Sequence, residues 1–486
     1  MSKYLLALLC GLLFPLGFAP FDYWPLTILS ISLALYLAIE RVGKNTFLLG
    51  LFYGIGQWGL GISWVYVSIH YHGNQGIVSS LFITTLFVFF LSLYTGLTFY
   101  LIKKFRTRNK NLNYLLFFPV IWVTVEIIRS YLFTGFPWLI VGTSLAGTSM
   151  GGWIPIIGTY GTSILAVMIS GSLILIFGSN NKMYWSPALI VMIILLSSFS
   201  LDKINWTKKI SSIQASIYQP NLTLEQKWSS EGVRQTMSMI ENSISNAHEG
   251  EFIFFPETAI IFDKADLHKW ILDIDKEAKS RNISLISGII ARDLQNPGLI
   301  ERYNRIEGFG AIKGHYDKIH LVPFGEYIPL RSYLDQIFDI LGINLINTLP
   351  GETYSLLKAH NIAISASICF EIAFSDLVRK TAKKSNLLVT ISNDTWFGSS
   401  IGPEQHLEIA QSRAQEHQKS LVRATNSGIS AVIDRKGNVV NRQGFFEDKK
   451  IREIVSIYEG KTPFSVVGNY FIYGYIILIF MYLLIY

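Results

Sequence analysis

Two kinds of hydrophobic pattern divide the chain. Before about residue 202 and after about residue 468, apolar residues form long uninterrupted stretches, each bounded by charge, proline or glycine. Stretches of spanning or near-spanning length fall at 4–20, 25–40, 46–68, 76–102, 114–133, 154–178, 184–201 and 469–486. The pattern predicts three parts: a transmembrane bundle of about seven helices over 1–202, a polar domain over 203–467 and a last transmembrane helix over 468–486.

Within the polar domain, short β-branched runs alternate with amphipathic segments. Strands are predicted at 213–218, 251–255, 284–290, 308–312, 362–368, 387–392 and 429–433. Helices are predicted at 229–247, 265–280, 374–384 and 403–418. Such alternation indicates a layered α/β fold, in which functional residues are expected where strands end and loops begin.

Composition agrees with a membrane protein. Half of the 486 residues are hydrophobic and 14% are aromatic, whereas only 15% are charged. The net charge of +7 comes largely from short loops beside apolar stretches, so it indicates membrane topology rather than nucleic-acid binding.

Those loops also predict an orientation. Basic residues gather in the loops on one side of the predicted bundle: Lys3, Arg41, Lys44, Lys103, Lys104, Arg106, Arg108, Lys110 and Lys182. The opposite loops, 69–75 and 134–153, contain no Lys or Arg. The excess of positive charge on the cytoplasmic side then places both termini in the cytoplasm and the polar domain outside it.

Three predicted strand ends carry reactive side chains. Glu257 follows the predicted strand 251–255, Lys318 opens a loop shaped by proline and glycine, and Cys369 ends the run 362–368. A thiol nucleophile needs a base, and a tetrahedral intermediate needs positive charge, so an acid, a lysine and a cysteine suffice for acyl transfer. Each residue alone is more often a surface charge or a small core side chain.

Other chemistries have weaker support. The chain has two cysteines, Cys10 and Cys369, which cannot form a disulfide framework. It shows no cluster of Cys and His with metal-ligand spacing, so no metal and no cofactor are expected. Inside an apolar stretch, Glu126 and Arg129 are expected to pair, either to orient helices or to serve function, and Trp138 follows nearby.

Several motifs together carry a family resemblance. They are Phe255-Pro-Glu257-Thr-Ala, Tyr316-Asp-Lys318-Ile-His-Leu-Val-Pro-Phe-Gly-Glu326-Tyr, Ile368-Cys369-Phe-Glu371 and Ser392-Asn-Asp-Thr-Trp-Phe-Gly398, with Ser63-Trp-Val-Tyr-Val-Ser68 and 126–138 in the apolar block. The chain resembles the nitrilase, or carbon–nitrogen hydrolase, superfamily, whose domain is an αββα sandwich. Within it, the chain resembles the apolipoprotein N-acyltransferase family over essentially its whole length.

That resemblance implies roles for individual residues. Glu257 matches the general base, Lys318 the cation that stabilises the oxyanion, and Cys369 the nucleophile. Further matches are a second acid, a tryptophan on a substrate-side loop and the acid after the nucleophile, namely Glu326, Trp228 and Glu371. Phe370 stands where the family usually has tyrosine. His320 and His406 are expected to be structural.

The implied activity moves a fatty acyl chain from a membrane phospholipid, through a Cys369 thioester, to the α-amino group of an apolipoprotein's diacylated N-terminal cysteine. It implies an enzyme of the bacterial inner membrane, and the loop charges then place the catalytic domain in the periplasm. A monomer is expected, because the polar domain shows no heptad repeat and no exposed apolar helix. Two alternatives stay open: a membrane-tethered amidase or nitrilase acting on a small amide, and a non-catalytic lipid- or lipoprotein-binding protein.

Overall fold

A computed structural model describes residues 2–41, 45–178, 185–263, 267–292, 301–327, 329 and 347–485. Lys44 and Lys182, two of the basic residues used to predict the orientation, lie outside this part of the chain. The chain divides into two compact units. The first comprises Met1–Trp206, Trp396–His417 and Lys461–Tyr486, and the second comprises Thr207–Thr395 and Gln418–Gly460.

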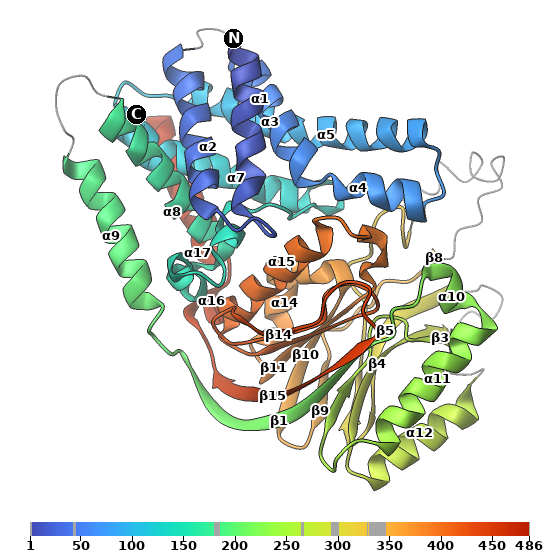
Figure 1. The fold of residues 1–486 in the computed structure, drawn as a ribbon. Coiled ribbons are helices and arrows are strands. Elements are labelled where there is room, and N and C mark those ends of the chain that lie inside the picture. The colour runs from blue at the N-terminus through green and yellow to red at the C-terminus, as the bar shows by residue number, and fades with distance from the viewer. Residues whose placement is uncertain are drawn as a thin grey trace. The chain divides into compact units, whose positions relative to one another are not determined.

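The first unit is helical (Figure 1). Its helices are α1 (Lys3–Leu13), α2 (Trp24–Tyr36), α3 (Thr46–Gly61), α4 (Trp64–Val67), α5 (Ile77–Lys104), α6 (Lys110–Leu112), α7 (Phe118–Tyr131), α8 (Ile154–Phe177), α9 (Trp185–Leu201), α15 (Gly402–His417), α16 (Pro463–Val467) and α17 (Tyr470–Ile485). Each of the eight predicted apolar stretches contains a helix, as predicted.

The apolar helices of this unit differ in length. In the described residues, three helical stretches are long and apolar enough to cross a membrane: 77–104, 110–134 and 149–177. A fourth results if the pair 46–61 and 64–72, bent by 55°, counts as one span. The remaining apolar helices, near 3–17, 24–40, 185–201 and 470–483, have 10–17 residues.

Small residues let helices of this unit approach closely. A Cβ built on Gly54 of α3 would lie 2.8 Å from Ser92 Cα of α5, and one on Gly50 would lie 2.8 Å from Thr95 O. Only glycine fits at such distances, so this small-xxx-small pair packs α3 against α5. Trp58 adds a hydrogen bond from Nε1 to Thr95 Oγ1 at 3.2 Å.

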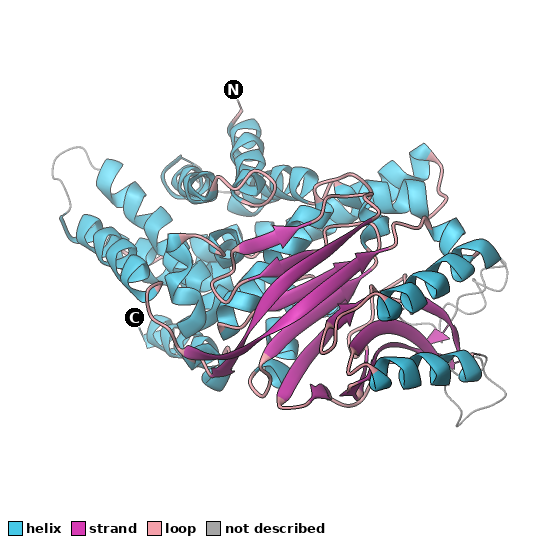
Figure 2. Ribbon diagram, turned by 60° about the horizontal axis from the view of Figure 1, so that its bottom comes forward, coloured by secondary structure: helices cyan, strands magenta, loops and turns pink. Residues whose placement is uncertain are grey.

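The second unit contains two β-sheets (Figure 2). The first has the order β15-β1-β2-β4-β5-β7, with β3 beside β4 and β8 beside β5; the second has the order β14-β13-β12-β11-β10-β9-β6. First-sheet strands are β1 (Thr207–Gln219), β2 (Phe252–Phe254), β3 (Ile260–Asp263), β4 (Ser284–Arg292), β5 (Glu301–Gly310), β7 (His315–Asp317), β8 (Asn347–Thr348) and β15 (Lys449–Gly460). Second-sheet strands are β6 (Ile312–Lys313), β9 (Leu356–Ala359), β10 (Ile362–Ile368), β11 (Leu387–Ser392), β12 (Leu421–Thr425), β13 (Ala431–Ile433) and β14 (Val439–Arg442).

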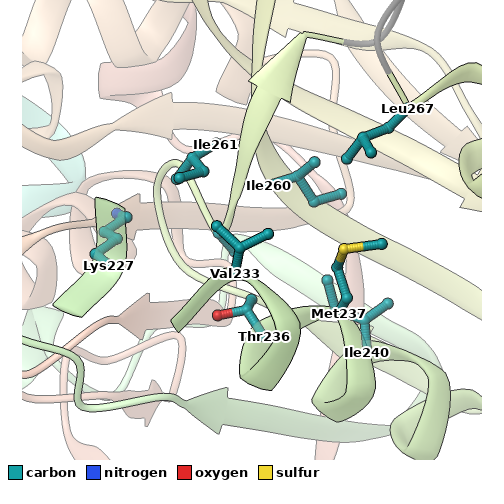
Figure 3. Close-up of a pocket in the computed structure, with 9 residues that line it drawn as sticks. Lys227, Val233, Thr236, Met237, Ile240, Ile260, Ile261 and Leu267 are labelled. Carbon is teal, nitrogen blue, oxygen red and sulfur yellow. The ribbon is translucent and has the colours of Figure 1, made fainter. Parts of the chain in front are cut away.

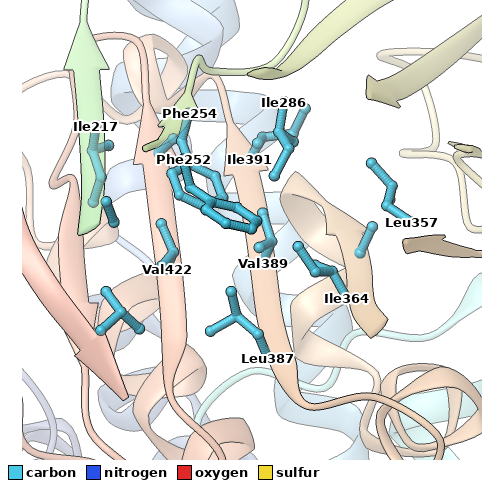
Figure 4. Close-up of a cluster of buried hydrophobic side chains, with 14 of the residues drawn as sticks. Ile217, Phe252, Phe254, Ile286, Leu357, Ile364, Leu387, Val389, Ile391 and Val422 are labelled. Carbon is cyan, nitrogen blue, oxygen red and sulfur yellow. The ribbon is translucent and has the colours of Figure 1, made fainter. Parts of the chain in front are cut away.

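A shared apolar core joins the two sheets. Phe252 and Phe254 of β2 lie among Val389 and Ile391 of β11 and Val422 of β12 (Figure 4). Because side chains alternate along a strand, the opposite face of β2 serves a second core, in which Ile253 packs with α11 (Ser230–Ser245) and α12 (His268–Ser280). These two helices lie side by side over the first sheet (Figure 1).

On the second sheet, α14 (Ser375–Ala382) packs on β10, and Ser365 Oγ bonds Thr381 Oγ1 at 2.6 Å. The layered α/β fold predicted from the sequence is therefore confirmed. The predicted helix at 403–418 is also present, as α15, but it belongs to the helical unit.

Candidate active site

The predicted reactive residues follow strands of both sheets in the second unit. Glu257 lies three residues beyond β2, Lys318 follows β7 directly, and Cys369 follows β10 directly. Since β10 and β11 run parallel, the ends of these two strands share one edge of the second sheet, and Asn393 follows β11 there. The sheet topology thus brings together residues from four separate segments.

Glu257 is buried and held at both carboxylate oxygens. Its Oε1 accepts a hydrogen bond from Asn304 Nδ2 at 2.6 Å and lies 3.7 Å from Lys318 Nζ. Its Oε2 accepts a hydrogen bond from the main-chain N–H of Asn393 at 2.8 Å. Fixed donors of this kind hold a carboxylate in one orientation, which is what a general base requires.

Lys318 is buried between two carboxylates. Its Nζ lies 2.7 Å from Glu326 Oε2, closer than it lies to Glu257. Burial alone would lower the pKa of Lys318, but the charges of Glu326 and Glu257 outweigh it and raise that pKa well above its ordinary value. Lys318 therefore stays a cation and can stabilise an oxyanion.

Glu326 is the closer partner of that cation. Its Oε2 also accepts the N–H of Val322 at 2.8 Å, and its Oε1 accepts Asn304 Nδ2 at 3.1 Å. Burial works to raise the pKa of Glu326, but Lys318 and these donors lower it overall. Asn304 thus bridges Glu257 and Glu326 through one amide nitrogen.

Cys369 stands at the junction of β10 and the short 3₁₀ helix Cys369–Ala373. Burial, with Glu257 adding to it, raises the pKa of the thiol to about 12, while Lys318 and a hydrogen bond with Ser392 oppose the rise. The thiol is thus within electrostatic reach of both predicted partners. It is protonated at neutral pH, so attack on an acyl group requires a base to take its proton.

Backbone strain accompanies these residues. Cys369 has φ +52°, Thr258 beside Glu257 has φ +47°, and Phe324 in the loop before Glu326 has φ +62°. The left-handed region is costly for residues with a Cβ and persists only where surrounding contacts enforce it. Such outliers gather at functional sites, and here they occur in three loops that converge on one cluster.

Glu371 is fully buried and connects two of these loops. Its Oε1 accepts hydrogen bonds from Tyr316 Oη at 2.8 Å, from the N–H of Ile319 at 2.7 Å and from the N–H of His320 at 3.0 Å. Its Oε2 accepts the N–H of Ile368 at 2.8 Å. Burial raises the pKa of Glu371 to about 7, against the effect of these donors.

The side chains of Phe370 and His320 pack with Phe374. The Phe370 and Phe374 rings meet edge to face with centroids 5.1 Å apart, and the His320 ring lies 3.8 Å from that of Phe374. Phe370 thus places an apolar ring directly after Cys369. His320 thus lies in an aromatic contact, and its structural role stays a prediction.

Three residues near the cluster were not assigned roles from sequence: Asn304, Asn393 and Lys227. Asn304 lies inside β5, where a single amide in an alternating strand gives no clear signal. Asn393 acts through its main chain, to which its side-chain type is no guide. Lys227 precedes Trp228 in the helix α10 (Leu224–Trp228), and the burial that distinguishes it is visible only in the fold.

Trp228 itself is 52% exposed. An indole left in solvent at the end of α10 is available to contact a substrate. Its predicted place on a substrate-side loop is consistent with this exposure and stays a prediction.

The structure corrects one expectation about the helical unit. No direct ion pair joins Glu126 to Arg129 among the described residues. Arg129 Nη1 donates to the carbonyl oxygens of Phe136 at 2.5 Å and Trp138 at 2.8 Å, and Glu126 Oε1 accepts the N–H of Val141 at 3.1 Å. Both charges bind main-chain groups of the loop after α7, because those groups have no helical partners there.

Trp138, in the same loop, is buried in the helical unit. Its Nε1 donates to Gln405 Oε1 of α15 at 2.7 Å, and its ring packs on those of Trp64 and Phe136. His406 is also buried, with its ring 5.8 Å from that of Trp138. The substrate-binding role predicted for Trp138, Glu126 and Arg129 stays a prediction.

Comparison with known proteins extends these observations to the whole chain. Residues 10–172 match the family described as the apolipoprotein N-acyltransferase N-terminal domain, and residues 209–459 match carbon–nitrogen hydrolase. The apolipoprotein N-acyltransferase of Photobacterium profundum is 32% identical over 98% of this chain and 93% of its own length. Those of Haemophilus influenzae and Wigglesworthia glossinidia brevipalpis are 33% and 35% identical, over 97% and 96% of this chain and 92% and 95% of their own lengths.

These relatives cover both units at an identity that establishes common descent. The motifs that suggested the resemblance lie in both matched regions. The chain therefore belongs to the apolipoprotein N-acyltransferase family and carries a catalytic domain of the carbon–nitrogen hydrolase superfamily.

Proposed function

We propose that this protein transfers a fatty acyl chain from a membrane phospholipid to the α-amino group of an apolipoprotein's N-terminal S-diacylglyceryl-cysteine, through a thioester on Cys369. The observation that carries the proposal is the cluster of buried Glu257, buried Lys318 and half-buried Cys369 in a chain of this family. It supplies a base, a fixed cation and a nucleophile for two successive acyl transfers.

The first transfer forms the thioester. Glu257 takes the proton of the Cys369 thiol while Sγ attacks the ester carbonyl carbon of the phospholipid. The oxyanion is stabilised by Lys318 Nζ and by the main-chain N–H of Phe370. When the intermediate collapses, the ester C–O bond breaks, the lysophospholipid oxygen receives the proton from Glu257, and the acyl chain stays on sulfur.

The second transfer forms the amide. The neutral α-amino nitrogen of the acceptor attacks the thioester carbonyl and gives a proton to Glu257. The C–S bond breaks, and the Cys369 sulfur regains that proton. Because Glu257 accepts and returns one proton in each transfer, the cycle ends with the enzyme unchanged.

The raised pKa of Cys369 suits this cycle. A thiol with pKa about 12 is neutral between turnovers, so it is protected from unproductive reaction until Glu257 takes its proton. The fixed positions of Glu257, between Asn304 and the Asn393 N–H, and of Lys318, against Glu326, support the base and cation roles.

We also propose a cellular location and a membrane topology that suit this activity. The protein is a multi-pass monomer of the bacterial inner membrane with both termini cytoplasmic and the catalytic domain periplasmic, where both lipid-bearing substrates reside. The distribution of basic residues supports this orientation, since the loops 69–75 and 134–153 carry no Lys or Arg.

Mass spectrometry of the protein incubated with phospholipid vesicles and no acceptor tests the proposal. We expect a fatty acyl mass on the Cys369 peptide that hydroxylamine removes. Adding a peptide with a diacylated N-terminal cysteine must move the acyl group to its amine. Cys369→Ala is expected to abolish the adduct while the protein stays folded and inserted, and Cys369→Ser to retain little.

The alternatives predict other outcomes. Hydrolysis of small amides without a lipid-derived adduct identifies the membrane-tethered amidase. Neither adduct nor hydrolysis, in protein that still binds vesicles, identifies the non-catalytic binding protein. Either outcome contradicts the acyltransferase proposal.

A further inference from the structure

Lys227 is a buried lysine directly behind the candidate base. It is 5% exposed, and no carboxylate forms an ion pair with it among the described residues. Its Nζ donates to the carbonyl oxygen of Glu257 at 2.8 Å and to Thr258 Oγ1 at 2.5 Å. Burying an ammonium group without an ion pair is costly, so a lysine in this position needs a compensating role.

Among the described residues, the cavity beside Lys227 has no second charged side chain in its lining. The stem of Lys227 borders a small cavity lined by apolar side chains, among them Val233, Ile260 and Ile261 (Figure 3). None of the lining residues carries a carboxylate. The charge that acts on Lys227 is that of Glu257: burial lowers the pKa of Lys227 to about 8, and Glu257 opposes the decrease.

The main chain that Lys227 binds is strained and tightly confined. Thr258 has φ +47°, and a Cβ built on Gly288 of β4 would lie 2.4 Å from Thr258 N. The strand β4 thus leaves this turn little room, and the Lys227 ammonium also binds it. Removing that ammonium frees the Glu257 carbonyl and the Thr258 hydroxyl together.

The segment that carries Lys227 is itself anchored. A capping box joins Thr223 and Gln226 at the start of α10. Before it, the N–H of Leu222 donates to Asn426 Oδ1 at 3.2 Å, and Asn426 Nδ2 donates back to Leu222 O at 2.7 Å. Asn426 Nδ2 also contacts Asn393 Oδ1 at 3.3 Å, so the segment of α10 is tied to Asn393, whose N–H is one of the two donors that fix Glu257.

We propose that Lys227 is a positioning residue for the proton transfers of Glu257. Its two hydrogen bonds hold the turn that aims the carboxylate, and its positive charge favours the ionised carboxylate that must accept the thiol proton. This rests on the proposed function, in which Glu257 is the base. The other groups that face Glu257 are Lys318 and Cys369, with Glu326 connected through Asn304.

Two variants separate the hydrogen bonds from the charge. Lys227→Met keeps the length of the apolar stem and removes both the hydrogen bonds and the charge. Lys227→Gln removes the charge and keeps a donor. Lys208→Met, at an exposed position of β1, is the matched control for replacing a lysine by methionine.

The first measurement is the rate of acyl-adduct formation on Cys369 against pH in the full-length protein. For Lys227→Met we expect a decrease of about 10- to 100-fold near neutral pH, because a misaimed base loses rate steeply. Lys227→Gln, which keeps a hydrogen-bond donor for the turn, should lose less rate than Lys227→Met, and Lys208→Met should show no change.

The second measurement does not require phospholipid. The infrared bands of the Glu257 carboxylate, identified by their loss in Glu257→Gln, are compared between the variants at neutral pH. We expect these bands to shift in Lys227→Met and Lys227→Gln but not in Lys208→Met, because the charge and the hydrogen bonds beside the carboxylate change. Unchanged bands, or a rate loss that accompanies lower stability without a spectral change, overturn the proposal for Lys227. Failure of the wild-type protein to form an adduct while the bands still shift counts against the acyltransferase function alone.

Discussion

At the scale of single residues, the thiol of Cys369 is governed by opposing neighbours. Burial and the Glu257 carboxylate raise its pKa, and Lys318 and Ser392 lower it. The proposed base therefore suppresses the free thiolate, although in the proposed cycle it enables attack. Reactivity toward a substrate and reactivity toward a simple electrophile are separate properties of this site.

This difference between reactivity toward a substrate and reactivity toward a simple electrophile gives a first prediction. Glu257→Gln removes a negative charge near the thiol, so the pKa of Cys369 should fall and alkylation by iodoacetamide at pH 8–9 should become about 3- to 10-fold faster. Acyl transfer should meanwhile be lost. Lys318→Met should have the opposite effect on alkylation, because it removes the cation that lowers the thiol pKa.

Peptide-level mass spectrometry distinguishes labelling of Cys369 from that of Cys10, and Cys369→Ser provides the blank. If Glu257→Gln is alkylated more slowly than the wild type, Glu257 supports the thiolate at rest, and the description of the resting thiol as neutral is wrong.

At the scale of elements, Glu371 joins the end of β10 to the loop after β7. Four donors converge on it, three of them main-chain N–H groups. Tyr316, Ile319 and His320 come from one segment and Ile368 from the other, so one carboxylate sets the distance between the Lys318 loop and the strand of Cys369.

Glu371→Gln should therefore destabilise the domain. Oε1 can still serve its three donors, but the amide nitrogen then faces the N–H of Ile368, which costs about 1–3 kcal/mol. The pH dependence has a definite sign. Because burial raises the pKa of Glu371 to about 7, its stabilising contribution is full below the ordinary value near 4.5 and is lost as the pH rises through 7. The difference from wild type should thus be larger at pH 5 than at pH 8.

Thermal unfolding in detergent at both pH values measures this effect, with Glu352→Gln, an exposed carboxylate, as control. A difference that grows with pH would mean that the four donors, rather than burial, control the protonation of Glu371.

The elements also show what the sequence can and cannot predict. The strands 362–368 and 387–392 were predicted with the bounds of β10 and β11, because continuous apolar runs indicate buried strands. The predicted strand 308–312 is instead the end of β5 and the start of β6, because Gly310 turns the chain with φ +76°. The strands β12 and β15 were not predicted, since charged residues interrupt their apolar patterns.

The residues of the candidate site also differ in whether the sequence alone can reveal them. Glu257 and Cys369 are visible in the sequence because each follows an apolar run, and Lys318 because it opens a loop shaped by proline and glycine. Asn304 and Lys227 contribute through burial and through contacts with residues distant in sequence, which no local pattern encodes. For the same reason, the spacing of Glu126 and Arg129 did not reveal that both bind the loop after α7.

At the scale of the whole molecule, α15 is the unusual element. It lies in sequence between β11 and β12 of the second sheet, yet it is packed within the helical unit. Gln405 accepts from Trp138 and donates to Gly61 O at 3.0 Å. Near the end of α15, Glu416 Oε1 accepts the N–H of Thr159 at 3.2 Å, directly after Gly158 breaks α8 with φ +68°. The helix α15, which lies within the sequence that matches carbon–nitrogen hydrolase, thus supplies a hydrogen-bond acceptor at the point where α8 of the helical unit is broken.

This arrangement gives the last prediction. Glu416 Oε2 also accepts from Arg413 Nη1 at 2.7 Å, and both side chains are at most 3% exposed. Glu416→Ala should destabilise the protein by about 3–5 kcal/mol, since it leaves a buried guanidinium without its partner and the Thr159 N–H without an acceptor. Replacing both residues, as in Arg413→Met with Glu416→Leu, should cost less, because no buried charge remains.

The chain offers a matched control on its surface. Arg234 and Glu231 have the same three-residue spacing and the same 2.7 Å separation, but their side chains are 69% and 80% exposed. Glu231→Ala should change the melting temperature little, because exposed pairs are screened by water. If the two glutamate substitutions lower the melting temperature in detergent equally, burial of the α15 pair carries no special weight, and apolar packing alone holds α15 in the helical unit. If only Glu416→Ala does so, the ion pair and the acceptor for the broken α8 are what hold this part of the catalytic chain within the helical unit.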